Sequence, residues 1–140
     1  MIERYEEYLK YELNYSNYTI KEYIIHVKEF LFYCDENKID YLNINKDIII
    51  DYLKKIDNLS NKSISAILSS LRCFYNYLLD NKMIEVNYFK LISNPKLEKK
   101  LPTFLSYEDI RKVIDSIEET DALSIRNKMI IELLYATGIR

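Results

Sequence analysis

Two residues at the end of the chain combine a helix-terminating turn with a phosphate-binding group. Gly138 is the only glycine among 140 residues, and Arg140 follows two positions later in the sequence YATGIR. Glycine enters the left-handed conformation at a helix end without the steric penalty of a Cβ atom, so Gly138 predicts the end of a helix. The guanidinium of Arg140 is always charged and can bind two phosphoryl oxygens at once. The alternative is that Arg140 is an ordinary surface arginine.

A second set of polar side chains shares one face of an expected helix at residues 62–81. The opposite face is apolar at helical spacing, which predicts that it packs against a core. The polar face carries no acid before Asp80 and consists of Lys62, Ser65, Ser69, Arg72 and Asn76. Hydroxyls and sparse cations can approach a phosphate backbone closely and donate hydrogen bonds to it. A solvent-exposed helix face of low charge is the alternative interpretation.

Both prolines of the chain fall in residues 93–106, which read SNPKLEKKLPTFLS. Proline cannot continue a regular helix, and it favours extended backbone at the residue before it. This stretch therefore predicts a semi-rigid linker between two domains. Its cations are Lys96, Lys99 and Lys100. They could contact a polyanion, or they could form a run of solvated charges.

The overall charge gives a mixed indication of the partner. A net charge of −2 and an isoelectric point of about 5.5 speak against a nucleic-acid-binding protein. The distribution differs along the chain, with 8 basic and 12 acidic residues in residues 1–57, but 9 basic and 5 acidic residues in residues 58–112. Residues 113–140 hold 3 basic and 5 acidic residues. The positive charge is thus concentrated in the middle, which weakly favours a polyanionic partner.

The cysteines and the apolar runs speak against a metalloprotein, a secreted protein and a membrane-spanning protein. Cys34 and Cys73 lie far apart without a CxxC pattern, and only His26 is near either of them, so we expect no metal site. Two free thiols without a signal peptide suit the reducing cytoplasm. The longest apolar run is far too short to span a membrane.

Hydrophobic periodicity predicts an all-α fold with six helices. We expect helices at residues 1–14, 20–37 with Thr19 as N-cap, 46–56 with Asn45 as N-cap, 62–81 capped by Ser60 or Asn61, a helix opened by the capping box Ser106–Asp109, and 123–136. The first four helices are enough for an independent core, whereas the last two form an unfinished domain. We therefore place a first domain at residues 1–92, the linker at 93–105, and the start of a second domain at 106–140.

Four segments, in order and at matching spacing, resemble the tyrosine recombinases, the family of phage integrases and Xer-type recombinases. They are YTIKEYIIHVKEFLFYC, ILSSLRCFYNYLLDNKMI, NPKLEKKLPTFLSYEDIRKVI and IRNKMIIELLYATGIR. The resemblance covers nearly the whole chain as the first part of a longer protein. It implies a SAM-like four-helix core-binding domain, a basic linker, and two helices of a truncated catalytic domain.

The resemblance also implies a set of DNA contacts, because the second and fourth helices of the family's core-binding domain face the major groove. Carried over to this sequence, the contacting residues would be Thr19, Lys21, Lys28, Lys62, Ser65, Ser69, Arg72, Lys96, Lys99 and Lys100. Most of them would touch phosphates, so affinity should fall steeply with salt. Arg72 is the best candidate for a contact with a base edge, for example guanine.

In the family, a tyrosine attacks a DNA phosphate and forms a phosphotyrosyl intermediate, so no metal or nucleotide cofactor is needed. Arg140 matches the first catalytic arginine, which would stabilise the charge of the pentacoordinate phosphorane. The family's remaining catalytic residues would lie beyond position 140, and none of the 14 tyrosines matches the nucleophile. We therefore expect that this chain alone does not cut DNA. The implied partners are double-stranded DNA with an inverted-repeat recombination site and other recombinase subunits in a synaptic tetramer.

The sequence departs from the family pattern in the second helix, and two other functions stay open. Family members often carry arginines at the positions of Ile24 and Ile25 and an acid at that of His26, so possible phosphate contacts are missing here. One alternative is a truncated, non-catalytic integrase that occupies DNA sites as a regulator. The other is a helical protein-interaction module without a DNA role. A reading frame that continues past Arg140 into a His-x-x-Arg pair and a late tyrosine would distinguish the recombinase from the regulator.

Overall fold

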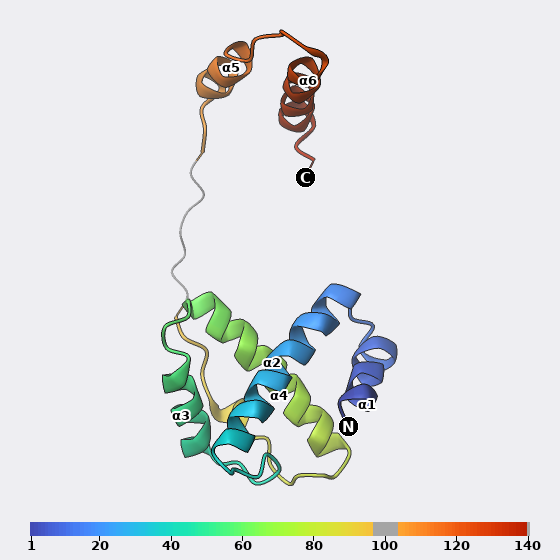
Figure 1. The fold of residues 1–140 in the computed structure, drawn as a ribbon, viewed down its shortest axis with the longest axis vertical. Helices are drawn as coiled ribbons and strands as arrows, with labels where there is room; N and C mark the ends of the chain where they lie inside the picture. Colours follow the sequence, from blue (N-terminus) through green and yellow to red (C-terminus); the bar gives the residue numbers. More distant parts are fainter. Residues whose placement is uncertain (97–103, 140) are drawn as a thin grey trace. The chain divides into compact units, whose positions relative to one another are not determined.

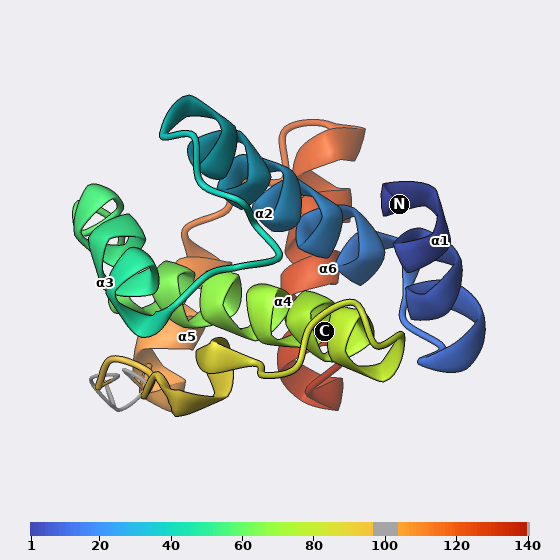
Figure 2. The same ribbon diagram turned by 90° about the horizontal axis from the view of Figure 1, so that it is seen from below.

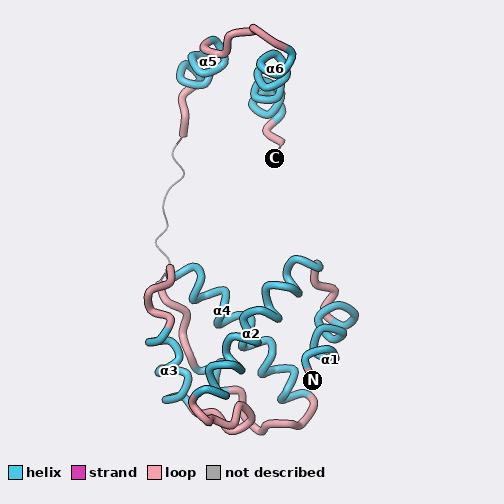
Figure 3. Tube along the Cα trace, in the orientation of Figure 1, coloured by secondary structure: helices cyan, strands magenta, loops and turns pink. Residues whose placement is uncertain are grey.

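The computed structural model describes residues 1–96 and 104–139, which contain helices and loops but no strand within these two ranges (Figure 3). The predicted all-α fold is therefore confirmed. The chain divides into two compact units, Met1–Glu98 and Lys99–Arg140, which we call unit 1 and unit 2.

Unit 1 is built around two long helices that cross each other (Figures 1 and 2). Its elements are α1 (Ile2–Glu7), the π-helical turn η1 (Tyr8–Glu12), α2 (Asn17–Glu36), α3 (Lys46–Lys55), α4 (Asn61–Asp80) and the 3₁₀ turn η2 (Tyr88–Leu91). The sequence predicted one helix for residues 1–14. Its second half is instead wound with the wider π-helical hydrogen bond, from Leu13 N to Tyr8 O at 3.2 Å.

The core of unit 1 lies where α2 and α4 meet, and it is rich in aromatic rings. Phe30 of α2 contacts Tyr52 of α3 at a ring distance of 4.9 Å and Phe89 of η2 at 5.4 Å. On the other side, Tyr5 of α1 meets Phe74 of α4 edge-on at 5.0 Å. Such edge-to-face pairs contribute about 0.5–1.5 kcal/mol beyond burial of their area. The apolar stripes predicted from periodicity thus converge on one core.

The helices α2 and α4 have matching ends. Each has 20 residues. Each is preceded by a serine N-cap, whose hydroxyl accepts a hydrogen bond from Thr19 N at 3.2 Å in α2 and from Ser63 N at 3.1 Å in α4. The carboxyl ends match as well, because Lys38 and Lys82 adopt left-handed backbone conformations with φ of 54° and 57°. The amides that follow them close the turn onto Cys34 O and Leu78 O, and this pattern is the Schellman motif.

One predicted cap was wrong. Thr19 was expected to cap the second helix, but Ser16 is the N-cap and the helix starts at Asn17. The serine and the threonine are three residues apart, and the earlier hydroxyl takes the capping position while Thr19 lies in the first turn. The caps Asn45 and Ser60 and the capping box of Ser106 with Asp109 are confirmed.

After α4 the chain turns back along this helix. Residues 87–96, which we call the exit segment, contact α4 at Asn76, Arg72 and Asn61 in that order. The exit segment therefore runs antiparallel to α4 and returns to the end at which α4 begins.

Unit 2 contains α5 (Tyr107–Asp115) and α6 (Ala122–Thr137), which touch through Tyr107 and Tyr135. None of residues 104–139 is buried. Gly138 ends α6 in the left-handed conformation with φ of 63°, and its amide donates to Leu134 O at 2.9 Å. The predicted role of this glycine as a helix terminator is confirmed.

Candidate nucleic-acid interface

The amino-terminal ends of α2 and α4 lie at the same end of unit 1, opposite the loops that follow the two helices (Figure 1). The first amides of a helix have no partner within the helix, and the helix dipole gives this end a partial positive charge. The caps Ser16 and Ser60 occupy one amide each and leave others for an external acceptor. Two such ends on one side of a domain favour an anionic ligand there.

Three lysines add full charges to these two helices. Lys21 and Lys28 of α2 and Lys62 of α4 are all exposed. In the part of the chain that the structure describes, none of them has a carboxylate within 4 Å. By contrast, Lys54 and Lys55 of α3 pair with Asp51 and Glu36 at 2.8 and 3.1 Å. The lysines of the candidate interface are thus available to an external anion.

A groove between the first helical segment and α2 brings in a further cation. Its volume is about 420 Å³, and it is lined by Glu6, Lys10, Asn17, Ile20, Lys21, Ile24, Ile25 and Lys28. Lys10 was not predicted as a site residue, because it lies in an acidic helix and reaches α2 only through tertiary packing. The periodicity of the first helix marks it as exposed but cannot show which neighbour it faces. Glu6 is the one acid in the lining of this groove.

The hydroxyls predicted to face DNA are mostly engaged within the protein. Thr19 is half-buried, and its Oγ1 lies 2.9 Å from Ser16 Oγ in the cap of α2. Ser69 is also half-buried and donates to Ser65 O at 2.8 Å. Ser65 Oγ is itself buried and has no hydrogen-bond partner among the described residues. The hydroxyl of Ser65 is therefore out of reach of a phosphate in this conformation, contrary to its predicted role as a DNA contact.

Arg72 is held by the exit segment. Its Nε donates to Phe89 O at 3.0 Å, and its Nη2 donates to Ile92 O and to Asn94 Oδ1, both at 2.7 Å. The sequence suggested a free arginine on an exposed face. The structure instead gives it a structural role, because a segment that lies about twenty residues later in the chain covers this part of α4. A bidentate contact with guanine through Nε or Nη2 would require these hydrogen bonds to break.

Other predicted residues lie partly outside the described ranges. Lys96 is exposed, and its carbonyl accepts a hydrogen bond from Asn61 Nδ2 at 2.9 Å. Lys99, Lys100 and Arg140 are not among the described residues. In those ranges, no three His, Cys, Asp or Glu side chains are grouped as a metal site would require. None of the described helices is long and apolar enough to cross a membrane.

The comparison with known proteins places this helical arrangement in a family. Residues 2–82 match the family described as phage integrase, N-terminal SAM-like domain. This chain belongs to the tyrosine recombinase family. The matched residues span α1 to the end of α4, so the crossed helices and their exposed lysines lie inside the SAM-like domain. The predicted family and the SAM-like fold are confirmed.

Several curated tyrosine recombinases are similar to this chain. XerC of Bacillus subtilis is 34% identical over 145 residues, which cover 99% of this chain and 47% of the relative. XerC of Anoxybacillus flavithermus is 38% identical, with 96% and 46% covered, and XerD of Staphylococcus epidermidis is 32% identical, with 100% and 48% covered. The chain therefore spans about half the length of these recombinases. No solved structure matches it.

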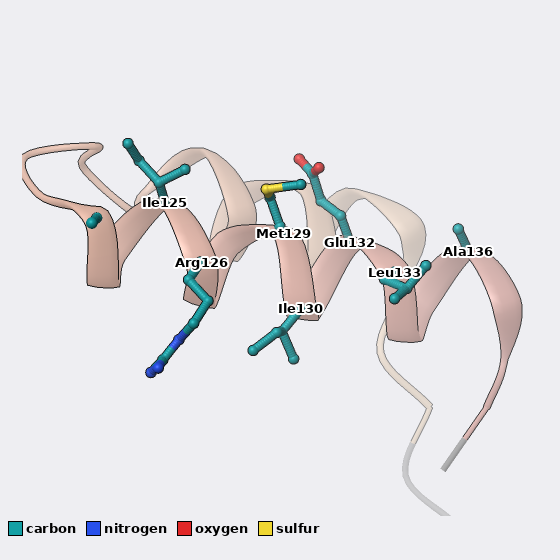
Figure 4. A pocket seen from close by; sticks show the side chains of 8 residues that line it. Ile125, Arg126, Met129, Ile130, Glu132, Leu133 and Ala136 are labelled. Carbon is teal, nitrogen blue, oxygen red and sulfur yellow. The ribbon is translucent and has the colours of Figure 1, made fainter.

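Unit 2 presents an apolar row that none of residues 104–139 covers. Ile125, Met129 and Leu133 follow one another along α6, and Ala136 continues the row (Figure 4). Their exposed fractions reach 64% at Met129 and 57% at Leu133. The row carries apolar contacts and no group that could perform chemistry, so we place the candidate DNA interface on unit 1 alone.

Proposed function

We propose that this chain is the DNA-binding part of a site-specific tyrosine recombinase, and that unit 1 grips duplex DNA with the amino-terminal ends of α2 and α4. The observation that supports this most is the pair of exposed lysines near these ends, Lys21 and Lys62, which have no carboxylate partner in the described ranges. Lys28, which is also exposed and unpaired there, lies about two turns further along α2 and extends the cationic surface from Lys21. Membership of the tyrosine recombinase family supplies the reason to expect DNA rather than another polyanion.

The contacts would be made mainly to the DNA backbone. Lysine ammonium groups act on phosphates as point charges, whereas planar pairs with a base edge favour arginine, asparagine or glutamine. Lys10 adds a fourth cation beside Lys21 in the groove next to α2. Affinity therefore arises largely from release of counterions and should depend strongly on salt. We assign no base-reading residue to unit 1.

In a complete recombinase, the chemistry would be transesterification through a phosphotyrosyl intermediate. Arg140 would bind the scissile phosphate, with Gly138 ending α6 two residues before it, so that the turn could direct the guanidinium. We propose an inverted-repeat recombination site as the DNA partner, other recombinase subunits as protein partners, and the cytoplasm as location. A truncated regulator that binds DNA without cutting it would use the same surface of unit 1.

Fluorescence anisotropy with a labelled duplex of mixed sequence tests this proposal. The chain should bind at about 50 mM salt and lose most of its affinity at about 200 mM. The double variant Lys21→Gln with Lys62→Gln should bind about tenfold more weakly at the lower salt concentration, since two phosphate contacts are lost. The matched control, Lys54→Gln with Lys55→Gln, removes the same charge from paired lysines of α3 and should bind like the original chain.

The possible outcomes separate the hypotheses. Absence of binding at low salt would reject the DNA role and favour a helical protein-interaction module. Equal weakening by the two double variants would mean that only net charge matters, and it would reject the ends of α2 and α4 as the interface.

A further inference from the structure

The exit segment is fastened to α4 at three levels. Asn87 Nδ2 donates to Arg72 O at 3.1 Å and to Asn76 Oδ1 at 3.0 Å. In the middle, Arg72 binds the segment with its side chain. At the amino-terminal end of α4, Asn61 Nδ2 donates to Lys96 O at 2.9 Å. The contacts follow α4 backwards over most of its length.

Arg72 makes the central contact, and its chemistry suits this position. Its guanidinium donates three hydrogen bonds, which go to Phe89 O, Ile92 O and Asn94 Oδ1. A guanidinium presents five N–H donors in a rigid plane, whereas a lysine ammonium is a compact group that cannot match this arrangement. Hydrogen bonds from charged donors are also the stronger ones. The position thus depends on an arginine and not merely on a positive charge.

A buried ring keeps the segment in register with Arg72. Phe89 is fully buried, and its ring lies 4.8 Å from that of Tyr75. Asn87 Oδ1 accepts from Phe89 N at 3.1 Å and holds the backbone on the approach to this ring. The carbonyl of Phe89 is therefore presented to Arg72 Nε at a fixed place.

The path of the exit segment determines where the chain leaves unit 1. A helix of 20 residues such as α4 is about 30 Å long. Without a return path, the chain would leave at Asp80, which is the end of α4 far from the proposed DNA contacts. With it, the backbone of Lys96 lies beside Asn61, the neighbour of Lys62.

We propose that Arg72 is a positioning residue, which returns the chain to the amino-terminal end of α4 so that Lys96 joins Lys62 at the DNA. This inference rests on the proposed function for its DNA part. It differs from a base contact by Arg72, since both hydrogens of Nη2 and the hydrogen of Nε are already donated within the protein. Arg72 acts on DNA only through the segment that it holds.

The first experiment needs no DNA. Lys90 is exposed and lies between the two carbonyls that Arg72 binds, so tryptic cleavage after Lys90 reports release of the exit segment. In the 140-residue chain, Arg72→Lys should accelerate this cleavage about tenfold, because a compact ammonium group cannot make all three hydrogen bonds of the guanidinium. Asn94→Ala removes one acceptor and should accelerate it about threefold. Cleavage after Lys82, which lies in the turn before the exit segment, is the control and should not change.

An unchanged rate after Lys90 in both variants would overturn the proposal. If Arg72→Lys does not fold, Asn94→Ala alone decides, because this change removes only an exposed acceptor. These measurements judge how the segment is held even if the chain proves not to bind DNA, so failure of the proposed function remains distinguishable.

The second experiment tests positioning with DNA. Lys96→Gln should weaken binding about threefold in the original chain, and it should have no further effect in the Arg72→Lys background, where the segment is already released. Independent, additive losses from the two substitutions would instead indicate that Arg72 contacts DNA directly, and would overturn the positioning role.

Discussion

His26 Nδ1 and Ser70 Oγ lie 2.8 Å apart and join α2 to α4 across the core of unit 1. Ser70 is fully buried, and its hydroxyl hydrogen is directed to Ala66 O at 3.0 Å. A serine has one hydrogen to donate, so when Ser70 donates to Ala66 O, His26 Nδ1 is the donor in this pair. The histidine is therefore a structural link between the crossed helices.

Replacing Ser70 tests the contribution of this link. Ser70→Ala removes the acceptor of His26 Nδ1, and we expect the free energy of unfolding to fall by about 1 kcal/mol. Urea denaturation followed by circular dichroism measures the change. Ser69→Ala is the matched control, because Ser69 bonds only within its own helix, and it should cost less. Equal losses would contradict a special role of the His26 contact.

The left-handed lysines at the ends of α2 and α4 predict stabilising substitutions. A side chain in this conformation costs about 1 kcal/mol relative to glycine, so Lys82→Gly should raise the free energy of unfolding by up to about that amount. Lys38→Gly should act alike. The control Ala66→Gly places glycine inside α4 and should lower stability by about 1 kcal/mol. Thermal melting shows whether each of the three variants is more or less stable than the original chain. A lower melting temperature for Lys82→Gly would contradict the cost assigned to the left-handed conformation.

Stability should fall in alkaline solution. Burial raises the pKa of Cys34 to about 11 and that of Tyr52 to about 12, and it also raises the pKa values of Tyr5 and Tyr75. A raised pKa of an acid means that the folded state favours the neutral form. The stabilisation is therefore complete below the unfolded pKa values, about 8.5 for cysteine and 10 for tyrosine, and is lost as the pH rises toward the folded values.

Urea titrations between pH 7 and pH 10.5 measure this dependence. The free energy of unfolding should be nearly constant at first and fall above about pH 8.5. Tyr52→Phe should flatten the decline above about pH 10, because one buried ionisable group is removed. Tyr18→Phe, at a ring that is 75% exposed, should leave the decline unchanged. If the free energy of unfolding of Tyr52→Phe declined as steeply as that of the original chain, other groups would control alkaline unfolding.

The slope of the salt dependence of DNA binding should report how many lysines contact phosphates. Each lysine that neutralises a phosphate contributes about 0.9 to the slope of log K against log salt concentration. Replacing Lys21, Lys28 and Lys62 together by glutamine should therefore reduce the slope by about 2.7. Binding isotherms at four or five salt concentrations give the slope. An unchanged slope would mean that these side chains are not in contact with DNA.

The apolar row on α6 predicts self-association. Met129 and Leu133 are more than half exposed, so each copy offers an uncovered apolar surface. Replacing both by lysine should lower light scattering at high protein concentration without loss of helix content. Since neither side chain is buried, a large loss of helix would mean that the row is covered in solution.

Local signals in the sequence were enough to predict most of the fold. The helix caps Asn45 and Ser60, the capping box at Ser106 and the turn at Gly138 each depend on residues within four positions, and all are found as expected. Thr19 was misassigned because a second hydroxyl three residues earlier satisfies the same local rule. Two equivalent signals so close together cannot be ranked from the sequence alone.

The candidate site was less predictable than the fold, since tertiary contacts decide which of its side chains are exposed. The exposure of Lys21, Lys28 and Lys62 follows from helical periodicity. The fate of Arg72 does not, because the exit segment folds over this part of the polar face that periodicity had marked as free. The burial of Ser65 Oγ does not follow from periodicity either. Lys10 joins the groove only through the packing of the first helical segment on α2. Periodicity indicates which face leaves the core, but not what another part of the chain will place there.

In α2 and α4, the residues that set the helix boundaries are different from the residues inside the helices. Start and stop positions are encoded in a few residues at each boundary, while the interior residues supply the core contacts and side chains such as Arg72, which holds the exit segment. Substitutions at interior positions should therefore leave the helix boundaries in place, so that the two amino-terminal ends keep their spacing. The exposed side chains between these fixed boundaries can thus be exchanged while the scaffold stays the same.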